Sequence, residues 1–171
     1  AELGDLPLAL HLAGSFLARY RRTIIPEDYL AQLRQPALLS HRSLQTSDYS
    51  PQADTLSPTG HVQHVGRTFA LSYEQLSNQD SIDQLALALR AHAACFAPGE
   101  IIPIPLLLQT ITGEDEANNL QIDDSLQRLV DLGLLEEATE GSLRLHRLLA
   151  HFVRQTAAES LPDAQKSVEI A

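Results

Sequence analysis

His146 is the residue whose type and position are best suited to chemistry. It lies in "LRLHRLLAHFVR", where a predicted strand gives way to a predicted helix. An imidazole at such a junction can donate to a phosphate oxygen, and the backbone N–H groups at the helix start can bind the same anion. A simpler interpretation is a junction histidine that is satisfied by a nearby carbonyl group. The residues alone favour the simpler interpretation.

Other reactive side chains form weaker patterns. His61 and His64 are three residues apart and could share a metal ion, but no cysteine or third histidine lies near them in sequence. We therefore predict no metal site. Cys95 lies in the apolar run "ALALRAHAACFAP", which favours a small buried side chain over a nucleophile. As the single cysteine, it cannot form an internal disulfide.

The motifs that hold the phosphates of ATP are absent from the sequence. No G-x-x-x-x-G-K-[ST] occurs, and no apolar strand ends in paired acids that could bind Mg²⁺. We therefore expect that this chain is not an enzyme by itself. We also expect it to bind no nucleotide tightly.

Charge and composition limit the partners of the chain. Apolar residues make up 44% of it, with no Trp or Met, and Leu and Ala dominate, which favours helices. Up to Tyr73 there are six arginines and six acids, whereas from Glu74 on there are six basic residues and sixteen acids. Such a balance argues against nucleic acid as a partner of the second part. With one cysteine and no apolar stretch of about 20 residues, a cytoplasmic protein without a membrane role is predicted.

Two helices are predicted in residues 1–44. Pro7 lies in the first turn of one helix, with Asp5 as its N-cap, and Pro26 starts the other, which runs to about Arg34. Residues 45–60, "TSDYSPQADTLSPTG" with the preceding Gln45, are rich in Ser, Thr and Pro and are predicted to be a linker. Residues 1–44 are therefore expected to form a small helical subdomain.

Residues 61–158 show the element order of a winged-helix domain. Two helices are predicted before "APGEIIPIP", which breaks the second, and another helix restarts at Pro105. The amphipathic helix in "LQIDDSLQRLVDLG" ends at Gly133, and "LLEEA", the turn "TEGS" and "LRLH" predict a two-stranded hairpin before a last helix. The predicted fold is mainly α, a small helical subdomain followed by a winged-helix domain with a short two-stranded β-hairpin. Residues 159–171 are predicted to be a C-terminal tail.

Three motifs, in order, resemble the NB-ARC ATPases of the STAND class, a family that includes plant disease-resistance proteins and many bacterial regulators. "GDLPLAL" followed by "HLAGSFL" resembles the "GLPLAL" motif of the family, and "RTFALSYEQL" resembles the start of its winged-helix region. "LRLHRLLAHFVR" resembles the end of that region, where the family carries a Met-His-Asp motif. The resemblance covers about the whole chain and identifies residues 1–44 as ARC1-like and 61–158 as ARC2-like.

The resemblance implies a nucleotide switch. In this family the two lobes close over ADP on a separate P-loop lobe, and exchange for ATP releases the winged helix for assembly. The motif proline that approaches adenine corresponds to Pro7, and the motif histidine that approaches the ADP phosphates corresponds to His146. Leu145 replaces the Met and Arg147 the Asp of the plant motif, so no role of that Asp is transferred.

Further partners also follow from the resemblance. The chain begins abruptly, so we expect it to be part of a longer protein, with a P-loop lobe before Ala1 and a repeat-type sensor domain after Ala171. That parent protein would bind ADP and ATP, hydrolyse ATP slowly and form homo-oligomers on activation. The alternative function is a winged-helix DNA-binding regulator. Its recognition helix, about Ile122 to Leu132, would carry three aspartates against Arg128 alone, which disfavours contact with phosphates.

Overall fold

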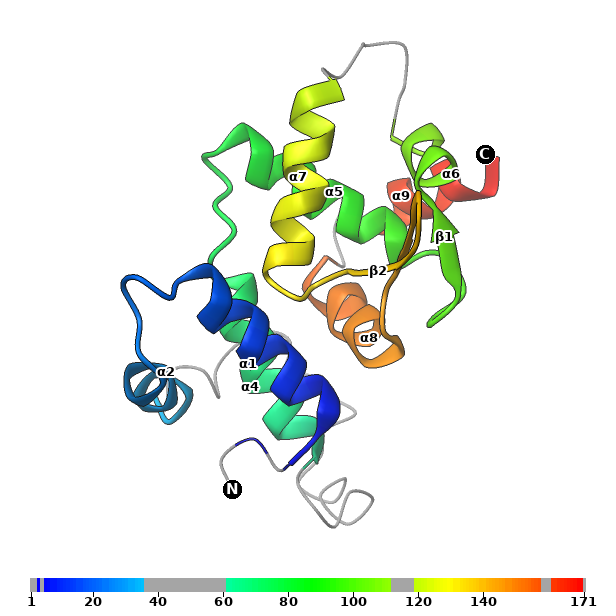
Figure 1. The fold of residues 1–171 in the computed structure, drawn as a ribbon. Helices are drawn as coiled ribbons and strands as arrows, with labels where there is room; N and C mark the ends of the chain where they lie inside the picture. The colour runs from blue at the N-terminus through cyan, green and yellow to red at the C-terminus, as the bar shows by residue number, and fades with distance from the viewer. Residues whose placement is uncertain (1–2, 4, 36–60, 112–118, 158–160, 171) are drawn as a thin grey trace. The chain divides into compact units, whose positions relative to one another are not determined.

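The computed structural model describes residues 3, 5–35, 61–111, 119–157 and 161–170, which divide into two compact units (Figure 1). The first unit contains residues up to Gln75 together with Asp131–Gly133. The second contains Leu76–Val130 and the residues from Leu134 on. The predicted linker, residues 45–60, lies outside the described residues.

The first unit is built from helices α1 (Pro7–Arg19), α2 (Pro26–Leu33) and α4 (His61–Tyr73). Both α1 and α2 begin with proline, because the fixed φ of proline suits a first turn whose N–H groups have no partner within the helix. The prediction for Asp5 is wrong. Leu6 is the N-cap of α1 and provides no side-chain bond, whereas Asp5 adopts a left-handed backbone conformation with φ 53°.

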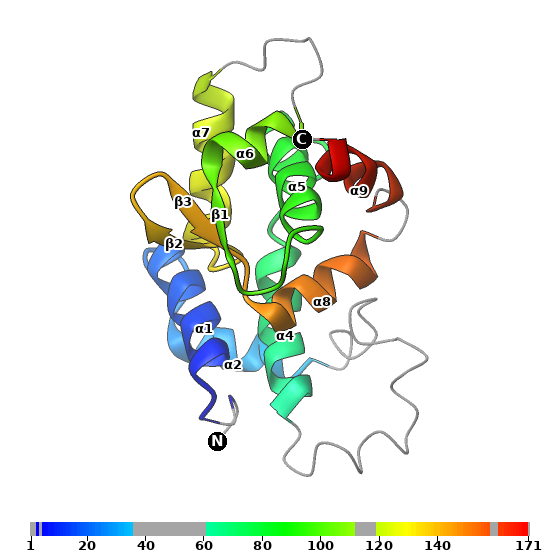
Figure 2. The same cartoon turned by 90° about the vertical axis from the view of Figure 1, so that its right-hand side faces the viewer.

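The predicted mainly α fold with a winged helix is confirmed in the second unit. Helix α5 (Ser81–Ala93), strand β1 (Ile101–Pro103), helices α6 (Ile104–Gln109) and α7 (Asn119–Asp131), and strands β2 (Glu136–Thr139) and β3 (Ser142–Arg144) follow one another as in a winged helix. The β2–β3 hairpin is the wing, and helices α8 (Arg147–Thr156) and α9 (Leu161–Ile170) follow it. The three strands form one antiparallel sheet in the order β1-β3-β2 (Figure 2).

The sheet has one strand more than the predicted hairpin. The segment "IIP" was expected only to interrupt helices, but Ile102 pairs with Leu143 and both side chains are 2% exposed. Pro103 is tolerated because it ends an edge strand, where a missing N–H breaks no inner ladder. Burial of Ile102 therefore favours the pairing of β1 with β3 as a third strand of the sheet.

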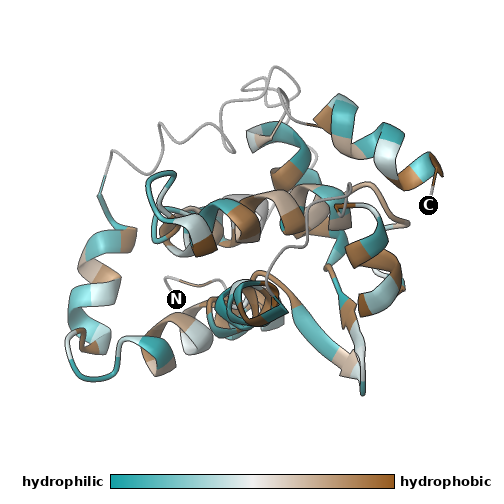
Figure 3. Ribbon diagram, turned by 90° about the horizontal axis from the view of Figure 1, so that it is seen from above, coloured by the Kyte–Doolittle hydropathy of each residue, from teal (hydrophilic) through white to brown (hydrophobic). Residues whose placement is uncertain are grey.

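Local signals set several element ends. The Asp80 carboxylate accepts from the N–H groups of Ile82 and Asp83 and caps α5. Gly133 has φ 71° and follows α7 in the left-handed conformation that closes many helices, as predicted. Gly141 has φ 73° in the turn between β2 and β3. The helices between these ends carry both hydrophobic and hydrophilic residues (Figure 3).

The units differ from the predicted domain limits. Residues 61–73 were assigned to the winged-helix domain, yet Ala70 and Leu71 of α4 pack with Ala13 and Phe16 in the first unit. The division therefore falls after Gln75. Residues 159–171, predicted as a tail, contain α9, which packs against α5.

Candidate functional site

His146 is the N-cap of helix α8 and lies directly after the wing. Its backbone is extended, with φ −60° and ψ 138°, and its ring Nδ1 accepts a hydrogen bond from the Leu148 N–H at 3.2 Å. Because Nδ1 is the acceptor, the neutral ring carries its proton on Nε2. Neither sequence interpretation named this partner. The histidine binds the backbone of its own helix and is half-buried.

The start of α8 is electropositive. Helix N-termini carry a partial positive charge, and the first turn of α8 contains no acidic residue that would offset it. Arg147, the first helical residue, is exposed and adds a full positive charge where acidic residues are usually preferred. The helix start and Arg147 thus favour an anion over a cation at this position.

Pro7 is exposed at the first position of α1. Leu10, one turn later, is 51% exposed, so the start of α1 presents an apolar surface to solvent. A surface of this kind can contact the face of a planar ring. Pro7 belongs to the first unit and His146 to the second, and each is placed within its own unit.

Helix α7 holds the position of a recognition helix but lacks the charge for one. Its arginine, Arg128, donates from Nε to the Asp83 carboxylate at 3.1 Å, and Asp83 also accepts from the Ser77 N–H. The exposed residues of α7 include Asp123 and Asp124 and no basic residue. This surface would repel a phosphate backbone.

The wing is acidic as well. Glu137 and Glu140 are exposed at the end of the β2–β3 hairpin. They border an open hollow of about 460 Å³ that is also lined by Ile104 and Leu143. Hydrogen bonds between Thr139 and Ser142 close the turn without help from a basic residue. The exposed charges at this hairpin are thus negative, and its arginine, Arg144, is only partly exposed.

Among the described residues of the second unit, partial burial shifts the pKa of Cys95 and that of His92. Burial raises the pKa of the Cys95 thiol, although the positive charge of Arg154 opposes this, and Sγ donates to the Ala91 carbonyl. Such a thiol is disfavoured as a thiolate nucleophile. Burial lowers the pKa of His92, whose Nδ1 lies 2.9 Å from Oγ1 of Thr110. Burial explains both pKa shifts, so neither shift indicates a catalytic role.

The histidine pair of the sequence lies in α4, within the first unit. His64 is half-buried. Across the described ranges, no group of three or more His, Cys, Asp or Glu side chains could hold a metal ion. In the same ranges, no helix is long and apolar enough to cross a bilayer.

Two contacts that shape this unit were missed in the sequence. One is the Asp83–Arg128 ion pair, and the other joins Arg154 of α8 to the C-terminal end of α5, where Nε donates to the Ala94 carbonyl at 2.9 Å. The partners are 45 and 60 residues apart in sequence. By contrast, the capping role of His146 could have been found from the sequence, because the residue stands just before a helical pattern.

Comparisons with protein-family models, with curated proteins and with solved structures find no match to this chain. Its function is therefore inferred from the residues described above.

Proposed function

We propose that this chain is the regulatory part of a nucleotide switch of the NB-ARC/STAND type. In this proposal the helical and winged-helix units close over ADP that is bound to a P-loop lobe of the same parent chain. Closure keeps the parent protein inactive, and ATP releases the winged helix so that protomers assemble. The chain catalyses nothing itself, and the parent is a slow cytoplasmic ATPase with a repeat-type sensor.

One observation carries the proposal, the electropositive start of α8 with His146 as its N-cap. Nδ1 is engaged by the Leu148 N–H, so the neutral imidazole can act toward a phosphate oxygen only as a donor through Nε2. Arg147 increases the attraction for an anion at the same helix end. Pro7 and Leu10 would contact the adenine ring with an apolar surface.

The acidic surface of the winged helix also supports a regulatory role over DNA binding. The exposed aspartates of α7 and the exposed glutamates of the wing occupy the surfaces that a DNA-binding winged helix directs at phosphates. Arg128 of α7 forms an ion pair with Asp83. A winged helix with this charge is better suited to contacts with protein.

The decisive experiment compares His146→Ala with His146→Asn in the full-length protein that carries this chain. A hydrogen bond to a charged group contributes about 1.5–3 kcal/mol, so losing it from the closed state alone should speed ADP release by roughly 10- to 100-fold. Both variants should show this, measured as dissociation of labelled ADP, together with more spontaneous assembly.

The two variants differ in what they do to the helix. Alanine also removes the N-cap, which costs about 0.5–2 kcal/mol, whereas asparagine is a good N-cap and should keep the melting temperature near that of the wild type. Faster ADP release in both variants would therefore reflect the phosphate contact. Unchanged ADP release in His146→Asn would show that His146 is only a cap and that the switch role is wrong.

A further inference from the structure

Helix α2 is held to the first unit by few interactions. It has eight residues, and its N-cap, Ile25, provides no side-chain bond. Isolated helices of fewer than about 12 residues are marginal in water, so α2 depends on its contacts with α1 and α4. Two of its side chains are buried, Tyr29 and Leu33. By comparison, α1 has thirteen residues and five buried side chains.

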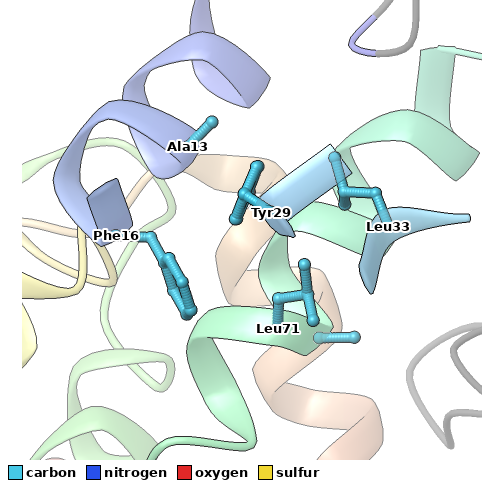
Figure 4. Close-up of a cluster of buried hydrophobic side chains, with 6 residues drawn as sticks. Ala13, Phe16, Tyr29, Leu33 and Leu71 are labelled. Carbon is cyan, nitrogen blue, oxygen red and sulfur yellow. The ribbon is translucent and has the colours of Figure 1, made fainter. Parts of the chain in front are cut away.

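Tyr29, the larger of these two anchors, is poorly satisfied. Its ring packs against Phe16 with centroids 5.1 Å apart, within an apolar cluster that includes Ala13 and Leu71 (Figure 4). The residue is 1% exposed, and its hydroxyl has no hydrogen-bond partner among the residues that the structure describes. In the same unit the buried Ser72 hydroxyl is also unsatisfied. A buried polar group without a partner opposes the packing that buries it.

We propose that α2 is a latch that opens locally while α1 and α4 stay folded. Opening would return the Tyr29 hydroxyl to water, where it regains its hydrogen bonds, so this group shifts the equilibrium toward the open form. It would also uncover the apolar surface formed by Ala13, Phe16 and Leu71, which Tyr29 covers when the latch is closed. Opening of α2 does not require the proposed nucleotide switch.

Two acidic side chains at the start of α2 oppose opening. Their stabilising effect is smaller than that of the apolar contacts that hold the helix. Glu27 and Asp28 lie in the first turn of α2, where negative charge interacts favourably with the helix dipole. Because these residues are exposed, salt weakens their contribution. Whether the latch opens is therefore decided mainly at Tyr29 and Leu33.

The test is amide hydrogen exchange of the 171-residue chain and of its Tyr29→Phe variant. Phenylalanine keeps the ring and removes the hydroxyl. In the wild type we expect the amides of Tyr29 to Leu33 to exchange well before those of Leu12 and Phe16 in α1. In Tyr29→Phe the α2 amides should exchange about 5- to 100-fold more slowly, because the closed form no longer buries an unsatisfied hydroxyl.

Tyr20→Phe is the matched control. The Tyr20 ring also packs against Phe16, at 4.9 Å, but the residue is only half-buried. This variant should change α2 exchange by no more than about twofold. The latch is disproved by any of three outcomes. These are α2 exchange as slow as that of α1 in the wild type, no slowing in Tyr29→Phe, or equal slowing in α1, α2 and α4, which would indicate a change in the stability of the whole unit.

Discussion

At the start of α8, the imidazole of His146 already has a partner in its own helix. The bond from the Leu148 N–H to Nδ1 fixes the ring and selects the tautomer of its neutral form. The proposed anion contact would use the other nitrogen, Nε2, and so would not compete with the cap at Nδ1. For this reason an alanine substitution alone could not separate the two roles, and the asparagine variant is needed.

His92 gives the chain a pH-dependent stability. The Thr110 hydroxyl donates to the Leu107 carbonyl at 2.6 Å, so its oxygen accepts from the His92 Nδ1–H. Burial lowers the pKa of His92 in the folded state, and folding therefore favours the neutral ring. This contribution is complete above the unfolded pKa of about 6.5 and is lost as pH falls below it, through the lower pKa of the folded state.

We expect the wild type to lose more stability than His92→Gln between pH 7 and pH 5. Glutamine can still donate to Thr110 but binds no proton in this range. Urea unfolding at several pH values measures the difference between the two proteins. Parallel stability curves would show that His92 does not titrate differently on folding.

At the scale of elements, the Asp83 carboxylate joins α5 to α7. It accepts from the Arg128 guanidinium and from the Ser77 N–H, and Asp83 is 7% exposed. Asp83→Ala would leave both donors without this acceptor, and breaking a buried pair costs about 3–5 kcal/mol. Because the Arg128 side chain is 17% exposed and can turn to water, we expect a loss of about 2 kcal/mol, measured by urea unfolding. Asp123→Ala, at an exposed position of α7, the helix that carries Arg128, is the control and should change stability little.

The charge of helix α7 also bears on the alternative function, DNA binding. With Asp123 and Asp124 exposed and Arg128 paired, we expect no DNA binding by this chain at moderate salt. An electrophoretic mobility shift assay with duplex DNA at several salt concentrations checks this. A retarded band whose affinity falls steeply as salt is added would favour the DNA-binding regulator.

At the scale of the whole molecule, the proposed switch requires nucleotide affinity from outside this chain. The sequence lacks the phosphate-binding loop and the acids that hold Mg²⁺. We therefore expect isothermal titration of the 171-residue chain with Mg·ADP or Mg·ATP to show no saturable binding at concentrations of tens of micromolar, an affinity weaker than about −6 kcal/mol. A tight complex would mean that the chain contains a phosphate site of its own.

The sequence by itself determined the local features of this protein. Pro7 and Pro26 begin helices, Asp80 caps α5 and Gly133 follows α7 in the left-handed conformation, because each of these depends on the φ angle or side chain of one residue and its near neighbours. The helix order and the hairpin follow from the same local signals. The winged-helix class could therefore be predicted before any contact was known.

The tertiary structure alone decided which of these elements pack together. Pairing of β1 with β3, the grouping of α4 with α1, and the Asp83–Arg128 bond join segments that are far apart in sequence. Such contacts depend on burial and on loop closure over the intervening chain, and no spacing within a short window encodes them. The same holds for the Tyr29 hydroxyl, because a tyrosine on an amphipathic helix is equally compatible with a satisfied and an unsatisfied oxygen until its neighbours are in place.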